Sequence, residues 1–130
     1  MTAAFRDLDV GRSVRPLPAD TEFELERVIP VGRTVNSPEG RVIVCSVEIW
    51  SGLVVVRWVL PEPVTRDRGA PYFKLGDDRG TLYLVYEAGF GGTLFTGWST
   101  FMPQPSEEAT VLYVGAALSK PAAIEVDLTV

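Results

Sequence analysis

The sequence contains no histidine. Histidine is the commonest proton shuttle near neutral pH, and it completes the Ser-His-Asp and Cys-His catalytic sites. Its absence excludes those sites, together with metal centres that need imidazole ligands. An enzyme without histidine needs paired carboxylates, an activated lysine or a cofactor. We find no convincing arrangement of that kind, so we expect a non-catalytic protein with neither a cofactor nor a metal.

Cysteine and long apolar runs are also scarce. The single cysteine, Cys45, excludes an internal disulfide framework, which makes a reducing compartment the simpler assumption. Apolar runs such as 53–56 and 58–60 are far too short to span a bilayer, and residues 1–10 contain no apolar run typical of a signal peptide. These features predict a cytoplasmic protein that does not enter a membrane.

Basic residues are outnumbered by acidic ones, 12 to 17, which leaves a net charge of −5. Proteins that bind nucleic acids attract the phosphate backbone with clustered lysine and arginine. Here the arginines are scattered, and the only lysines are Lys74 and Lys120. We therefore expect no nucleic-acid partner.

The chain has 130 residues, enough for one domain, and its 46% hydrophobic content is typical of a folded protein. Residues 1–20 lack sustained periodicity and contain Gly11, Pro16 and Pro18. This composition predicts an extended or disordered N-terminal arm, or alternatively an arm that docks on a second chain. Residues 21–130 are then expected to form a single domain.

From Phe23 onward, apolar and polar residues alternate in short segments separated by turn residues. Pro30 limits the first segment to an edge strand or a bulged strand. No stretch has a useful helical period. The pattern predicts an all-β fold of two packed antiparallel sheets with seven or eight strands, although a small barrel would have similar spacing. The expected strands are 23–26, 42–50, 53–60, 72–75, 81–87, 93–102, 111–116 and 124–130.

Two features resemble immunoglobulin-like domains. The spacing between Cys45 and Trp58 is similar to that between the strand B cysteine and the strand C tryptophan of those domains. The segment 107–113 is loosely similar to the entry into their strand F. The resemblance implies an immunoglobulin-like sandwich and nothing about activity.

The strand expected at 42–50 places Ile43, Cys45, Val47 and Ile49 on one face. An apolar face of this kind predicts that Cys45 is a buried, unreactive core thiol.

The strand expected at 53–60 is apolar on both faces. One face, made by Val54, Val56, Trp58 and Leu60, suits the core. The opposite face is covered by the loop at 61–71 or by the N-terminal arm, or else it contacts another protein, because arginine and aromatic residues favour such contacts. Trp50 would extend this face, and Phe90 lies in a glycine-rich loop where aromatic residues often make contacts. The predicted partner-binding residues are Leu53, Val55, Arg57, Val59, Phe90 and Trp50.

Two other motifs have a simpler structural explanation. Asp77 and Asp78 precede Gly80 in a turn, where neighbouring side chains point apart, and the loop spacing of a calcium site is missing. The glycines around Phe90 are followed by a strand pattern, whereas a phosphate-binding loop leads into a helix.

The leading hypothesis is a non-catalytic protein-interaction module that self-associates or binds a protein partner. The alternative is a small-molecule or carbohydrate-binding sandwich that uses the aromatic residues Trp50, Tyr86 and Trp98.

Overall fold

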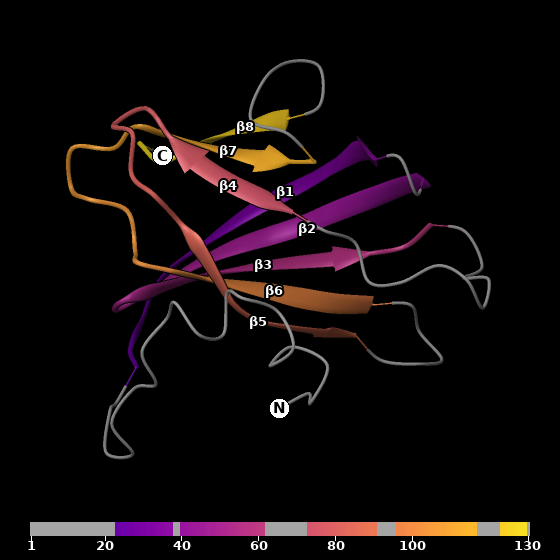
Figure 1. The fold of residues 1–130 in the computed structure, drawn as a ribbon, viewed down its shortest axis with the longest axis horizontal. Coiled ribbons are helices and arrows are strands. Elements are labelled where there is room, and N and C mark those ends of the chain that lie inside the picture. The colour runs from indigo at the N-terminus through magenta and orange to yellow at the C-terminus, as the bar shows by residue number, and fades with distance from the viewer. Residues whose placement is uncertain (1–22, 38–39, 62–72, 91–95, 117–122, 130) are drawn as a thin grey trace.

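The computed structural model describes residues 23–37, 40–61, 73–90, 96–116 and 123–129 (Figure 1). These residues form eight strands and no helix, which confirms the all-β prediction. The predicted N-terminal arm, residues 1–20, lies outside the described residues. The strands are β1 (Leu25–Ser37), β2 (Gly40–Trp50), β3 (Leu53–Val59), β4 (Lys74–Asp77), β5 (Leu84–Phe90), β6 (Thr96–Met102), β7 (Val111–Gly115) and β8 (Ala123–Asp127).

The strands form two antiparallel sheets. One sheet has five strands in the order β1-β2-β3-β6-β5, and the other has three in the order β4-β7-β8. Figure 1 shows β4, β7 and β8 grouped at the top, with the other five strands fanning out below them. The chain crosses between the sheets from β3 to β4, from β4 to β5 and from β6 to β7. The central pairs β3–β6 and β4–β7 therefore join segments that are distant in the sequence.

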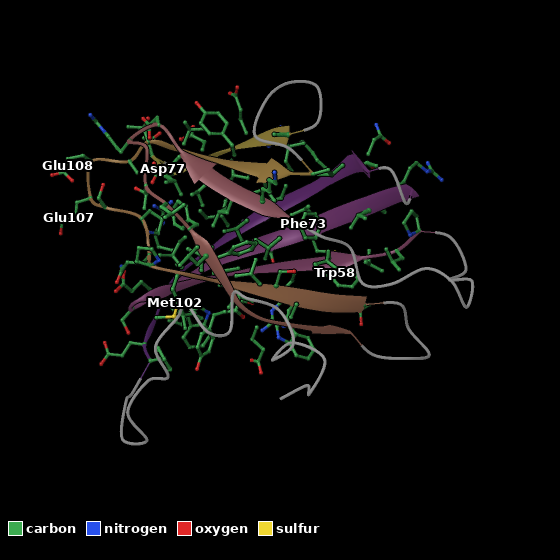
Figure 2. The ribbon with its side chains drawn as sticks, in the orientation of Figure 1. Trp58, Phe73, Asp77, Met102, Glu107 and Glu108 are labelled. Carbon is green, nitrogen blue, oxygen red and sulfur yellow. The ribbon has the colours of Figure 1, made fainter. Side chains whose placement is uncertain are left out.

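The core lies between the two sheets. Trp58 and Phe101 are each 1% exposed, and Leu112 of the smaller sheet is fully buried. The indole N–H of Trp58 donates a hydrogen bond to the Ser99 hydroxyl at 3.3 Å, which pairs the one polar group of this large side chain. Its ring centroid lies 6.4 Å from that of Phe73, just before β4 (Figure 2). The predicted core face of β3 is confirmed, since Val54, Val56, Trp58 and Leu60 are all buried.

Strand β1 is longer than the sequence pattern indicated, because it continues through Pro30. It is an edge strand, and its register with β2 shifts between Pro30 and Arg33. Edge strands and bulges both tolerate proline, because it has no N–H to donate to a neighbouring strand. The prediction of an edge or bulged strand at Pro30 is therefore confirmed. The guanidinium of Arg27 donates to the carbonyl of Leu128 at 2.5 Å, and that of Arg33 donates to the carbonyl of Glu125. Side chains of β1 thus bridge the two sheets beside β8.

The prediction that Cys45 is a buried core thiol is wrong. Cys45 is exposed, and it lies at a β-bulge where the register of β2 with β3 shifts between Val44 and Ser46. A bulge inserts one residue and reverses which side chains face inward beyond it. Val44 and Val47 are therefore both fully buried although they are three residues apart. Ile43, also expected in the core, is only half-buried.

The residues that carried the immunoglobulin resemblance also need correction. Cys45 and Trp58 lie on β2 and β3, which are hydrogen-bonded neighbours in one sheet. Strands B and C of immunoglobulin domains lie in different sheets. The spacing reflects a hairpin through Ser51 and Gly52 instead.

Candidate binding face

The five-stranded sheet has one face toward the core and another, here called the outer face, that points away from β4, β7 and β8. Side chains alternate across a strand, so the neighbours of Trp58 on β3, Arg57 and Val59, belong to the outer face. Cross-strand register extends this face sideways. Val55 is paired with Glu48 and Thr100, and Arg57 is paired with Ser46 and Trp98. Of the predicted partner-binding residues, Leu53, Val55, Arg57, Val59 and Trp50 are therefore brought together on one surface.

The centre of the outer face is buried. Leu53 is 7% exposed, Val55 9% and Thr100 7%, although none of them belongs to the core between the sheets. Val59 is half-buried. An apolar side chain that has already lost its water adds little free energy to an interface. Leu53 and Val55 are therefore poorer contact residues than the sequence suggested.

Exposed apolar surface lies instead at the β1 side of this face, where the sequence analysis did not place it. Leu25 is 48% exposed and pairs with Trp50, while Val28 is 54% exposed and pairs with Glu48. We call Leu25, Val28 and Trp50 the edge patch. The alternation of apolar and acidic residues at 23–26 indicated a strand, but its position beside Trp50 depends on the register between β1 and β2.

Glu48 forms an ion pair with Arg57 on the outer face. Its side chain is 12% exposed, and its carboxylate accepts hydrogen bonds from Nε of Arg57 at 2.5 Å and from the indole of Trp50 at 3.0 Å. Burial raises the pKa of Glu48, but the bonds from Arg57 and Trp50 outweigh it and leave the pKa below its ordinary value. Glu48 is therefore ionised near neutral pH, and its charge neutralises that of Arg57.

A hollow of about 510 Å³ lies on the side of Arg57 that points away from Trp50 and the edge patch. It is lined by Cys45, Ser46, Arg57, Trp58, Thr96, Gly97 and Trp98. Volumes of this size are typical of small-molecule sites. We call it the Arg57–Trp98 hollow.

The indole of Trp98 lies against the backbone of Gly89, its cross-strand partner on β5. A Cβ atom at position 89 would lie only 2.8 Å from Cη2 of Trp98. Glycine is therefore required for the ring to occupy this position. Among the described residues, the indole N–H of Trp98 has no hydrogen-bond partner.

The remaining aromatic candidates contribute less to this surface. The backbone of Phe90 pairs with Gly97 at the end of β5, so the predicted loop begins later than expected, and the Phe90 side chain lies outside the described residues. Tyr86 lies at a register shift between Val85 and Glu87. Of the three aromatic residues considered for ligand binding, Trp98 alone lines the hollow.

Asp77 and Asp78 form a structural turn, as expected. Asp77 accepts hydrogen bonds from the amides of Arg79 at 2.8 Å and Thr81 at 3.1 Å, and from the hydroxyl of Tyr83 at 2.7 Å. Asp78 points elsewhere and accepts bonds from the amide and the hydroxyl of Thr110 at 2.9 and 2.5 Å. Both carboxylates are engaged in holding the chain crossings in place.

These contacts change the acidity of both groups. Burial raises the pKa of Asp77, but the hydrogen bonds from Thr81, Tyr83 and Arg79 bring it below its ordinary value. Bonds from Thr110 lower the pKa of Asp78 to about 2. Burial and the bond to Asp77 raise the pKa of Tyr83. A catalytic proton donor near neutral pH needs a pKa close to 7, so neither aspartate is suited to that task.

Within the described ranges, no three acidic or cysteine side chains come together as a metal site, and no helix is present that could cross a membrane. Glu107 and Glu108, the other adjacent carboxylates, are exposed and project away from the sandwich (Figure 2). Comparisons of the chain with protein-family models, with curated proteins and with solved structures find no match. A functional assignment therefore depends on the outer face itself.

Proposed function

We propose that this protein is a non-catalytic interaction module that self-associates through its outer face. The observation that carries the proposal is the edge patch, in which Leu25 and Val28 are each about half exposed beside Trp50. Two copies related by a two-fold axis would bring the same patch of each chain together. A cytoplasmic location belongs to this proposal and rests on the single cysteine.

Packing of face against face fits this surface better than extension of the sheet. Edge strands associate through unpaired backbone groups, and β1 and β8 are the edges on this side. The carbonyls of Glu125 in β8 and of Leu128 just after it already accept hydrogen bonds from Arg33 and Arg27 of β1. The apolar side chains of the edge patch, by contrast, are free to meet a partner.

The expected association is weak. Burying the exposed half of each Leu25 and Val28 side chain contributes about 1 kcal/mol, so the four side chains of a symmetric dimer contribute about a thousandfold in Kd. A stable dimer needs about 800 Å² from each partner, so the contact has to extend beyond the edge patch itself.

Val28→Lys tests the proposal. A lysine at this position can pair with Glu48 across the strands, so the fold should tolerate it, whereas two such lysines would repel each other in a symmetric contact. We expect sedimentation equilibrium to show a concentration-dependent dimer for the wild type and a monomer for Val28→Lys, with similar melting temperatures.

Leu82→Lys is the matched control. Leu82 is 75% exposed in the connection between β4 and β5, away from the edge patch, so its substitution should leave the dimer unchanged. A wild type that stays monomeric at millimolar concentration would refute self-association. Equal loss of the dimer in both variants would show that the edge patch is not the interface.

We also infer an immunoglobulin-like topology. In constant-type immunoglobulin domains, strands A, B, E and D form one sheet and strands C, F and G the other. The orders β2-β3-β6-β5 and β4-β7-β8 correspond to these sheets, with β1 as an additional strand beside β2. Segment 107–113 then leads into the strand that corresponds to F.

The two central pairings are the decisive test of this topology. Backbone nuclear Overhauser effects are expected between Arg57 and Trp98, on the strands corresponding to B and E, and between Gly76 and Tyr113, on those corresponding to C and F. A missing contact at either pair would contradict the assignment.

A further inference from the structure

We infer that the Arg57–Trp98 hollow is a binding site for a neutral carbohydrate. This site lies beyond the proposed self-association, since it occupies the opposite side of the Glu48–Arg57 pair from the edge patch. Three features of its lining support this inference: a fixed aromatic wall, a neutralised charge and a set of polar groups that can hydrogen-bond a ligand.

The aromatic wall is provided by Trp98. Its ring is held against the backbone of Gly89, and this close packing limits the positions that it can adopt. A large aromatic side chain with a fixed orientation loses little conformational freedom on binding. Sugar rings present flat patches of C–H groups, and such patches pack favourably on an indole face.

The charge of the hollow is balanced. Among the described residues, Arg57 is the only charged one in its lining, and its Nε and Nη2 both donate to Glu48, at 2.5 and 3.4 Å. The pair is neutral, and the chain as a whole carries a charge of −5. An anionic ligand such as a phosphate or a sulfated sugar would therefore find no excess positive charge to hold it. This charge balance favours a neutral ligand over an acidic one.

Polar groups around the wall suit a ligand with many hydroxyls. Ser46 and Thr96 each contribute a hydroxyl that can donate and accept, and the indole of Trp98 contributes a donor. Half of the Arg57 side chain remains exposed, so its outer nitrogen can donate as well. A purely apolar ligand would leave these groups without partners, at a cost in affinity.

The sharpest test uses the indole N–H resonances of ¹⁵N-labelled full-length protein. The three tryptophans differ in environment, because Trp50 donates to Glu48 and Trp58 donates to Ser99, while Trp98 has no partner in the described part of the chain. The probes are neutral di- to tetrasaccharides of glucose, galactose, mannose and N-acetylglucosamine, together with sulfated heparin fragments. We expect at least one neutral sugar to shift the Trp98 signal in a saturable manner.

Two variants locate the binding. Trp98→Ala removes the wall and should weaken the affinity about tenfold or more. Gly89→Ala keeps the tryptophan but displaces its ring, and it should weaken binding as well. Leu82→Lys, at an exposed residue outside both the hollow and the edge patch, is the control and should bind with unchanged affinity. Melting temperatures show that each variant is folded.

The outcomes separate this inference from self-association. Val28→Lys should bind the same sugar as the wild type, because the edge patch does not line the hollow. Saturable binding of heparin fragments without any neutral sugar would overturn the charge argument. No shift of the Trp98 signal by any sugar at 10 mM, a concentration roughly ten-thousandfold above the Kd of a micromolar site, would overturn the inference. Equal loss of affinity in Leu82→Lys would place the site elsewhere.

Discussion

Val55 shows how a single residue decides the character of the outer face. It lies opposite Glu48 and is only 9% exposed, although it does not belong to the core between the two sheets. The residue pattern at 53–60 correctly predicted that Val55 lies on an apolar face of a strand. Whether that face was covered or open could not be read from alternation, because alternation records only which side of the strand a residue occupies.

Val55→Glu is therefore expected to damage the fold. The new carboxylate would be largely removed from water and directly opposite Glu48, whose own side chain is 12% exposed. We expect a loss of about 2–4 kcal/mol in the free energy of unfolding, measured by urea denaturation. Val55→Thr, which keeps the shape, should cost about 1 kcal/mol. A loss below about 0.5 kcal/mol for Val55→Glu would place Val55 on open surface.

Cys45 should react readily in the native protein. It is exposed at the bulge, and its sulfur makes a long contact of 3.9 Å with the carbonyl of Ile43. We expect its reaction with a disulfide reagent in the native state to be within about tenfold of the rate in denaturant. Much slower native labelling would mean that β2 has no bulge at this position and that Cys45 faces the core.

At the scale of the element, hairpins were the most predictable parts of the fold. Ser51 and Gly52 are a local turn signal between two apolar segments, and the structure joins β2 to β3 there. The bulge at Cys45 was not predictable, because it depends on how β2 meets β1 and β3. The sequence alone is compatible with either of two faces pointing inward, one with Val42 and Val44 and one with Ile43 and Cys45. The pairing of β2 with its neighbours determines that Val42 and Val44 are the buried residues.

The aspartates in the turn between β4 and β5 are expected to make the free energy of unfolding fall at acid pH. The pKa of Asp78 is lowered to about 2 in the folded protein, against about 4 for an ordinary aspartate in the unfolded chain. A lowered folded pKa means that the contribution of Asp78 is complete above pH 4 and is lost as the pH falls toward 2. Asp77 and Glu48 have lowered pKa values as well, so they act in the same direction.

Asp78→Asn isolates this contribution. At pH 7 the variant should melt below the wild type, because it loses the charge that accepts bonds from Thr110 and Val111. The difference in melting temperature should shrink between pH 4 and pH 2, where the wild-type carboxylate becomes protonated. Glu107→Gln, at an exposed carboxylate that projects away from the sandwich, serves as the control and should show no such trend. A difference that is constant from pH 7 to pH 2 would contradict the assigned role.

At the scale of the whole molecule, five of the predicted partner-binding residues come together on one sheet face, but the sequence did not predict the exposed apolar residues beside them. Arg57 and Trp50 were predicted to be contact residues from their types alone, and this stays a prediction. The exposure of Leu25 and Val28 and the alignment of Trp98 with Gly89 arise only when five strands adopt a specific register. Surface assembled from several strands has no local signature in the chain.

The crossing connections have a consequence for how fast the protein forms. Strand β3 pairs with β6 while its successor β4 pairs with β7, so neither sheet can be completed from a contiguous piece of chain. Loops must close over long separations before the central pairings stabilise anything, and sandwiches with such connectivity fold in milliseconds to seconds. Because the two pairings share the connections from β3 to β4 and from β6 to β7, we expect both sheets to appear in one kinetic phase after dilution from urea.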